Sequence, residues 1–360
     1  MKIRRSTKCS LKFTNKAKLR QLDLVLQEYG RVVNGFIDLF WDRAPTKVQL
    51  LKPVVDSVPS WFSARLRKVA AREAIDMVKA SRKRWKDVTK AIKPTHRGGR
   101  MCVSSTTASL VPAKNAVEFD CWLHLASIGN KIILDLPIKL HAHFNRLELR
   151  GKRLESYIIT LRYVQLSFEI ETGRKQEKDR CVGIDAGIGA LCSLSTGYQL
   201  GADVEAHIDR VKRCKHGSGG QLKASRALRQ RMAEVAKQVT QLASLVVVEN
   251  LKGITKNTKR RLVKSMRRSI GRWNVRYWLS RLQMTCEDTN VSFRTVSPYK
   301  TSQTCPVCGY ADRRNRSGDV FKCRDCGHTD NADVNAAKNI LDRFLTGPYG
   351  AGCKSVVICL

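Results

Sequence analysis

Acidic residues are scarce in this sequence. The 31 Asp and Glu residues stand against 67 Lys and Arg residues, which gives a formal net charge of +36. Self-repulsion of this size destabilises a compact chain unless a polyanion neutralises it. Nucleic acid is the natural partner, and its binding should weaken with salt because each neutralised phosphate releases counterions. The scarcity of acidic residues is greatest over residues 250–286, which contain no Asp or Glu.

Long apolar runs are missing as well. No segment approaches the roughly 18 apolar residues of a membrane helix. Residues 1–13 are charged but lack the apolar segment of a signal peptide. We therefore expect a cytosolic chain without a membrane partner, whose cysteines are reduced rather than paired in disulfides. With 360 residues, 42% of them hydrophobic, there is room for two or three domains with sizeable cores.

Four of the 13 cysteines form two CxxC pairs. They are Cys305, Cys308, Cys323 and Cys326. Two such pairs are typical of a closed tetrahedral zinc site, because each pair folds around one edge of the ion. Four thiolates leave no open position for water, so we expect a structural zinc ribbon over residues 302–329. The other nine cysteines are expected to be small buried or reduced residues.

Three acids mark the ends of ordered segments. Asp185 and Glu249 each end an apolar, strand-like run, and Asp333 opens a helix just beyond the second CxxC pair. Singly, each has a simpler interpretation as a turn, strand-end or helix N-terminal residue. Jointly, with a ribbon between the last two, they favour a nuclease metal site. Two Mg²⁺ ions about 3.5–4 Å apart share carboxylates in such sites, and hard oxygen ligands suit Mg²⁺. Asp330 is interpreted as a cap or first-turn residue.

The two halves of the chain predict different folds. Residues 181–360 alternate strands and helices with acids at strand ends, which predicts an α/β core of ribonuclease H type. The first half predicts a β-barrel formed by about 1–13 and 115–175, with a helical insertion at about 14–114. The expected helices are 16–41 and 60–88, and the expected strands are 2–12, 116–122, 131–136, 146–150 and 156–171. Residues 173–180 are the expected boundary, and 346–360 a loosely ordered tail.

Two basic stretches are candidate nucleic-acid contacts. One is a face of the predicted helix 60–88, and the other is the acid-free segment 250–286. Most charge runs are solvated surfaces, but here few acids balance them, so we favour phosphate contact. The candidates are Arg72, Lys79, Arg82, Arg260, Arg261, Lys264, Arg267, Arg268 and Arg272. Trp273 and Trp278 either stack on bases or anchor a helix on the sheet.

Five segments resemble the RuvC nuclease of the TnpB proteins, transposon-encoded RNA-guided DNA nucleases related to type V CRISPR effectors. These are VGIDAG, VVVENLKGI, SQTCPVCG, CRDCGH and DVNAAKNI, within residues 181–344. The resemblance implies that Asp185, Glu249 and Asp333 hold Mg²⁺ as catalytic acids and that the four cysteines hold zinc. For residues 1–180, which fit by architecture only, it implies a wedge barrel with an inserted helical recognition lobe.

The partners implied by the resemblance are a guide RNA and a complementary double-stranded DNA target. The expected activity is Mg²⁺-dependent hydrolysis of that target, by one or two copies of the protein on each guide RNA. Two alternatives stay open at this point. One is an RNA-guided DNA-binding regulator that does not cleave, and the other is a structure-selective nuclease that acts without RNA. Transposon and CRISPR association are equally open.

Overall fold

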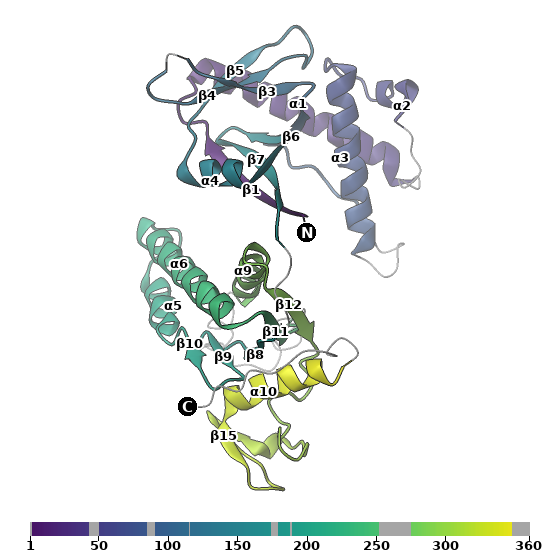
Figure 1. The fold of residues 1–360 in the computed structure, drawn as a ribbon. Helices are drawn as coiled ribbons and strands as arrows, with labels where there is room; N and C mark the ends of the chain where they lie inside the picture. Colours follow the sequence, from purple (N-terminus) through teal and green to yellow (C-terminus); the bar gives the residue numbers. More distant parts are fainter. Residues whose placement is uncertain are drawn as a thin grey trace. The chain divides into compact units, whose positions relative to one another are not determined.

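The computed structural model describes residues 2–42, 50–84, 91–114, 116–173, 179–187, 189–251 and 275–347. The chain divides into two compact units, one formed by Lys2–Glu171 and one that begins at Thr172. Figure 1 shows the elements of each unit. Within the described residues, no helix is both long and apolar enough to span a bilayer.

The first unit contains a four-stranded antiparallel sheet in the order β1-β7-β6-β2. Its strands are β1 (Lys2–Ser10), β7 (Tyr163–Glu171), β6 (Gly151–Thr160) and β2 (Arg100–Ser104). Alternate residues of β7 are buried, as expected for a sheet with one face on a core. β1 pairs with β7 along its whole length, from Lys2 opposite Glu171 to Ser10 opposite Tyr163. The strand before the helices therefore joins strands that follow them.

A second antiparallel sheet has the order β3-β4-β5. It consists of β3 (Ala108–Pro112), β4 (Cys121–Leu125) and β5 (Leu134–Ile138). The predicted strand at 146–150 is wrong, because this segment is the end of helix α4 (Ala142–Arg150). Phe144 and Leu147 are buried at helical spacing while Leu149 is 89% exposed, and the His141 side chain caps the helix by accepting from the Phe144 amide.

Helix α1 (Lys16–Trp41) confirms the predicted helix at 16–41. The Asn15 side chain caps it by accepting from the Lys18 amide, and its apolar residues are buried along one face. α2 (Lys52–Asp56) follows. α3 (Ala64–Lys83) begins four residues after the predicted start at 60 because Ser63 caps it, and the predicted end at 88 lies outside the described residues. The segment 14–114, predicted as helical, also contains β2 and β3.

The second unit contains a five-stranded sheet in the order β10-β9-β8-β11-β12. Its strands are β8 (Cys181–Asp185), β9 (Cys192–Leu194), β10 (Gln199–Leu200), β11 (Leu245–Glu249) and β12 (Ser292–Val296). β8, β11 and β12 run parallel, and β9 and β10 are antiparallel additions. Parallel neighbours need helical crossovers, which accords with the alternation of strands and helices in this half.

Helices cover both faces of this sheet (Figure 1). α5 (Val204–Arg213), α6 (Gly219–Leu242) and α9 (Val275–Asp288) lie on one face, and α10 (Ala332–Leu345) on the other. Trp278 of α9 is fully buried in the first layer, so it anchors the helix and does not stack on bases. Trp273 and the residues after 347, most of the predicted tail, lie outside the described residues.

A small antiparallel sheet in the order β13-β14-β15 lies between β12 and α10 in the sequence. Its strands are β13 (Arg316–Ser317), β14 (Val320–Lys322) and β15 (Thr329–Asn331). β15 ends where α10 begins, so the small sheet leads directly into the helix that carries Asp333.

Candidate metal sites

The four predicted zinc ligands converge on one point. Their sulfur atoms all lie within 4.8 Å of one another, and the Cys305–Cys326 and Cys308–Cys323 sulfur pairs are both 3.6 Å apart. Thiolates about 2.3 Å from a common zinc ion would stand about 3.8 Å from one another. Composition and spacing therefore fit a tetrahedral zinc site, which supports the predicted ribbon.

Each CxxC pair is closed by a glycine in the left-handed region. Gly309 has φ +77° and Gly327 has φ +75°, a conformation in which a side chain would be strained. The Gly309 amide donates to the Cys305 carbonyl at 3.0 Å. These turns aim both thiols of a pair to the same side.

Two of the predicted acids lie at the same edge of the five-stranded sheet. Asp185 is the last residue of β8 and Glu249 the last residue of β11. The two strands are parallel neighbours, with Ile184 opposite Val248. The acids therefore follow at equivalent positions, at the carboxyl edge where ligands of α/β sheets usually bind.

Asp333 reaches this edge from the first turn of α10. Its Oδ2 atom would lie 3.6 Å from a Cβ placed on Gly187, two residues beyond Asp185. The N-cap of the helix is Asn331, whose side chain accepts from the Asp333 and Val334 amides. The interpretation of Asp330 as a cap is wrong, since Asp330 belongs to β15 and pairs with Lys338 at 2.7 Å.

Burial and mutual repulsion act on this acidic cluster. The pKa of Asp185 is raised to about 7, first by burial and then by the charges of Glu249 and Asp333. Burial also raises the pKa of Glu249, against a hydrogen bond from Thr301 that lowers it. Crowded, buried carboxylates are costly without a cation, so the site suits a divalent metal. Among the described residues, only the four cysteines form a group whose potential ligand atoms all lie within 4.8 Å of one another. The three carboxylates are therefore less tightly grouped than the cysteines.

One cation already contacts the cluster. Arg316 of β13 donates from Nη2 to Asp333 Oδ1 at 2.7 Å, and its charge opposes the rise of the Asp185 pKa. The small sheet thus contributes a side chain to the acidic site. Sequence reasoning missed Arg316, because nothing in the spacing distinguishes it from the neighbouring arginines.

A cavity of about 320 Å³ adjoins Glu249 in the second unit. It lies along β11, β12 and α9, and its lining includes Arg276, Leu279 and Phe293. There is therefore room beside the second acid for a substrate group.

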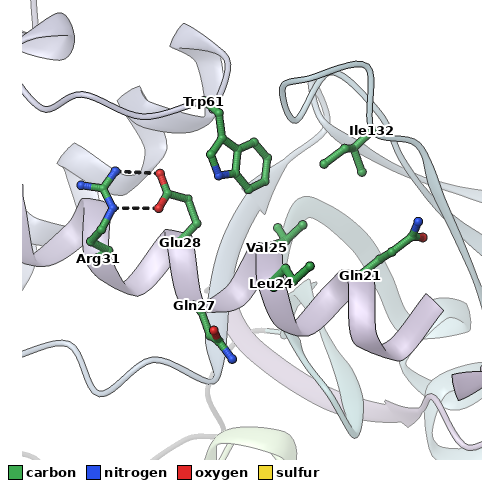
Figure 2. A pocket seen from close by; sticks show the side chains of 8 residues that line it. All are labelled: Gln21, Leu24, Val25, Gln27, Glu28, Arg31, Trp61 and Ile132. Carbon is green, nitrogen blue, oxygen red and sulfur yellow. Dashed lines mark hydrogen bonds and ion pairs between the residues drawn. The ribbon is translucent and has the colours of Figure 1, made fainter. Parts of the chain in front are cut away.

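A separate cavity of about 490 Å³ lies along α1 in the first unit. Figure 2 shows Trp61 and Ile132 facing Leu24 and Val25 of α1, with the Arg31–Glu28 ion pair at one end. Arg31 lowers the pKa of Glu28 through their hydrogen bond. None of the predicted acids or cysteines lines this cavity.

The predicted nucleic-acid contacts divide into two groups. Arg72 and Lys79 are exposed on α3 and line an open depression of about 650 Å³. Arg82 is partly buried, with its guanidinium 5.4 Å from the centre of the Trp41 ring, so its cation is already engaged. Arg260, Arg261, Lys264, Arg267, Arg268 and Arg272 lie outside the described residues.

Comparison with known proteins places these sites in a family context. The family model "Cas12f1-like, TNB domain" matches residues 277–340, from α9 into α10. A TnpB-like protein of Aquifex aeolicus is 32% identical over 128 residues, 34% of this chain and 41% of that protein. The CRISPR-associated endodeoxyribonuclease Cas12f1 of Sulfoacidibacillus thermotolerans is 47% identical over 55 residues, 15% of this chain and 13% of that protein. The putative RNA-guided DNA endonuclease InsQ of Escherichia coli is 49% identical over 47 residues, 13% of this chain and 12% of that protein.

Solved structures share the fold over most of the chain. The cryo-EM structure of the Cas12f1–sgRNA–target DNA complex matches with a TM-score of 0.57 at 13% identity, over 91% of this chain and 83% of that one. CasPhi-2 bound to crRNA matches with a TM-score of 0.50 at 10% identity, over 94% and 98%. The chain therefore shares its fold with the Cas12f1 and CasPhi-2 structures.

The resemblance to the TnpB family expected from the motifs is confirmed. The chain's matched segments span less than half the length of these curated relatives, 13% and 41% for Cas12f1 and the Aquifex protein.

Proposed function

We propose that the protein is an RNA-guided DNA endonuclease, which hydrolyses phosphodiester bonds of a DNA target complementary to its guide RNA. The observation that carries the proposal is the convergence of Asp185, Glu249 and Asp333 at one edge of the sheet. Relatives named as RNA-guided or CRISPR-associated endonucleases support the reaction class. The net charge of +36 supports nucleic acid as the partner.

The three acids would hold two Mg²⁺ ions in a RuvC-type centre. When bound, such ions activate water and stabilise the leaving oxygen of an in-line displacement. The chain's own contribution is to hold the carboxylates in place: Arg316 donates to Asp333, which lies in the first turn of α10, and Thr301 donates to Glu249. Zinc on the four cysteines would fix the fold of the ribbon that presents Arg316.

We further propose a division of labour between the two halves. Residues 1–180 would be the wedge barrel and helical recognition lobe that bind guide and target, with Arg72 and Lys79 on phosphate. Residues 181–360 would be the nuclease domain, and the basic residues 260–272 would guide nucleic acid toward its acids. The two alternatives, a non-cleaving regulator and an RNA-independent nuclease, become outcomes of the test.

The test begins with purification of the protein from cells that carry its native flanking DNA, followed by sequencing of the RNA that co-purifies. One discrete RNA whose variable end directs Mg²⁺-dependent cleavage of matching DNA is expected. Asp185→Ala should abolish cleavage while guided DNA binding persists, because the carboxylate serves the metals and not the duplex. Asp209→Ala, which removes a half-exposed acid of α5 paired with Lys212, is the matched control.

Three outcomes would contradict the proposal. Cleavage by Asp185→Ala at the programmed site would remove the acid from the mechanism. Guided binding by the wild type without nicking in Mg²⁺ would indicate a regulator. Full nuclease activity after RNase treatment, with no enriched RNA, would indicate a nuclease that recognises DNA structure.

A further inference from the structure

The loop of residues 297–304 connects β12 to the first CxxC pair and passes over Glu249. β12 ends at Val296, which stands opposite Glu249 in the parallel pair β11–β12. Lys300 holds φ +56°, an unusual conformation for a residue with a side chain. The Thr304 amide and hydroxyl both donate to the Lys300 carbonyl, at 3.1 Å and 2.9 Å. The loop is therefore a closed turn with a defined shape.

Thr301 is the residue of this loop that contacts the acidic site. Its side chain hydroxyl donates to Glu249 Oε1, and only 2% of the residue is exposed. The Pro298 carbonyl is a more distant alternative acceptor, at 3.3 Å. A hydroxyl has one proton to donate, and here the carboxylate is the nearer acceptor. This hydrogen bond fixes the orientation of the Glu249 carboxylate.

Helix α10 holds the loop from the opposite side. Asn339 Nδ2 donates to the Thr301 carbonyl at 2.8 Å and to the Thr304 carbonyl at 2.7 Å. Asn335 Nδ2 donates to the Thr304 carbonyl at 3.1 Å, and Arg343 Nη1 to the Ser297 carbonyl at 2.5 Å. Residues four apart lie on one face of a helix, so Asn335, Asn339 and Arg343 form one continuous line of donors to the loop.

The same helix carries Asp333 in its first turn. α10 therefore fixes the third acid directly and the second acid through Thr301. An α-helix is stiff over this length, so the separation of the two carboxylates is set before any ion arrives. Partners beyond the ligands themselves commonly orient the ligands of metal sites in this way.

We propose that Thr301 is a positioning residue for Glu249, held by Asn339 so that the acidic site is preorganised for divalent metal. This inference rests on the proposed function of the acids. The Thr301 hydroxyl then contributes to metal affinity, and the Thr301 methyl group contributes only to packing.

The test compares Thr301→Val, which keeps the shape and loses the hydroxyl, with Thr301→Ser, which keeps the hydroxyl. Mn²⁺ binding to the purified full chain is followed by electron paramagnetic resonance, and guided cleavage is measured against Mg²⁺ concentration. Thr301→Val should weaken Mn²⁺ binding and raise the half-saturating Mg²⁺ by about 10- to 100-fold, whereas Thr301→Ser should stay close to wild type. Zinc content and guide RNA binding should be unchanged in both variants.

Thr240→Val is the matched control. Thr240 is also buried in the second unit, but its hydroxyl donates to the Lys237 carbonyl of its own helix. The Thr240→Val variant should bind Mn²⁺ like the wild type. The ions at the acidic site are identified as those lost in Asp185→Ala.

Two results would overturn the inference. Thr301→Val that binds Mn²⁺ as tightly as the wild type would remove the hydroxyl from metal binding. Thr301→Ser that is as defective as Thr301→Val would show that the methyl group matters instead. The Mn²⁺ measurement needs no guide RNA, so a wild type that binds Mn²⁺ through Asp185 but fails in guided cleavage would refute the proposed function alone.

Discussion

The three acids at the edge of the second unit's main sheet are crowded like charges with limited access to water. Asp185 and Glu249 both have raised pKa values because burial disfavours their charged forms. Arg316, which donates to Asp333, opposes the rise of the Asp185 pKa. Such an arrangement lowers the stability of the folded chain but favours binding of a cation. The stability of the folded chain should therefore depend on pH.

Without added Mg²⁺, the contribution of Asp185 to stability should decrease as pH rises. The carboxyl keeps its proton to about pH 7 in the folded chain, against an ordinary pKa of 3.8. Between these values the folded state binds more protons than the unfolded state, so the free energy of unfolding falls with increasing pH. Asp185→Asn should therefore melt at a higher temperature than the wild type above about pH 7, and the difference should vanish near pH 4.

Asp209→Asn is the control for this melting series. Lys212 lowers the pKa of Asp209, so loss of that carboxylate should not stabilise the chain at any pH. Melting curves of both variants and the wild type across the pH range check the prediction. An Asp185→Asn effect that is constant with pH would contradict it.

At the scale of elements, the ribbon and α10 act on the acids together. β13 supplies Arg316, β15 runs directly into α10, and the 297–304 loop joins the first CxxC pair to Thr301. Loss of zinc should therefore disturb the acidic site through both connections, the small sheet that carries Arg316 and the loop that carries Thr301.

Cys305→Ala should lose zinc and cleavage together. In small zinc modules the metal contributes about 10–16 kcal/mol to folding, so the ribbon should unfold without it. Hydrogen exchange should increase over 302–331 and at the start of α10, while the sheet formed by β1 and β7 stays protected. Cys214→Ala, at a partly exposed cysteine outside the ribbon, is the control; cleavage by a zinc-free Cys305→Ala protein would contradict the coupling.

Gly183 in β8 determines how closely α10 approaches the sheet. A Cβ placed there would lie 2.2 Å from the Ala337 carbonyl oxygen and 2.8 Å from Leu341 Cβ. Gly183→Ala should therefore push α10 away and destabilise the second unit by about 1–3 kcal/mol or more, with a loss of cleavage. Gly219→Ala, where nothing lies within 4 Å, should be neutral in denaturant unfolding; equal midpoints for both variants would refute the prediction.

The sequence predicts some of these elements better than others, for physical reasons. α1 follows from its regular apolar spacing and its Asn15 cap, and the cysteine cluster from ligand chemistry. The segment 146–150 misleads because alternating Leu147 and Leu149 imitate a strand, although only Leu147 is buried. Arg316 and Thr301 could not be found, since their roles depend on contacts between residues distant in sequence.

At the scale of the whole molecule, charge dominates. If the protein binds nucleic acid as proposed, its net charge of +36 makes phosphate neutralisation the main source of that affinity. Exposed Lys and Arg side chains without a close acid should contribute to this affinity whatever the base sequence. Side chains that already make another contact, such as Arg82 against the Trp41 ring, should contribute less.

Arg72→Ala combined with Lys79→Ala should weaken guide RNA or DNA binding uniformly across sequences. If both residues contact phosphate, the slope of log affinity against log salt should become shallower by about 2, since each contact adds about 0.9. Lys2→Ala, at a lysine paired with Glu169 at 2.7 Å, is the control and should change the slope little. Titrations at several salt concentrations decide, and an unchanged slope in the double variant would exclude α3 from the interface.

The pairing of β1 with β7 has a consequence for how the protein is made. β1 leaves the ribosome well before its partner β7, which is the last strand of the same unit, with Lys2 opposite Glu171. Until β7 emerges, β1 presents unpaired backbone groups along its edge, which is a hazard for aggregation during synthesis. Contacts this remote in sequence also slow folding.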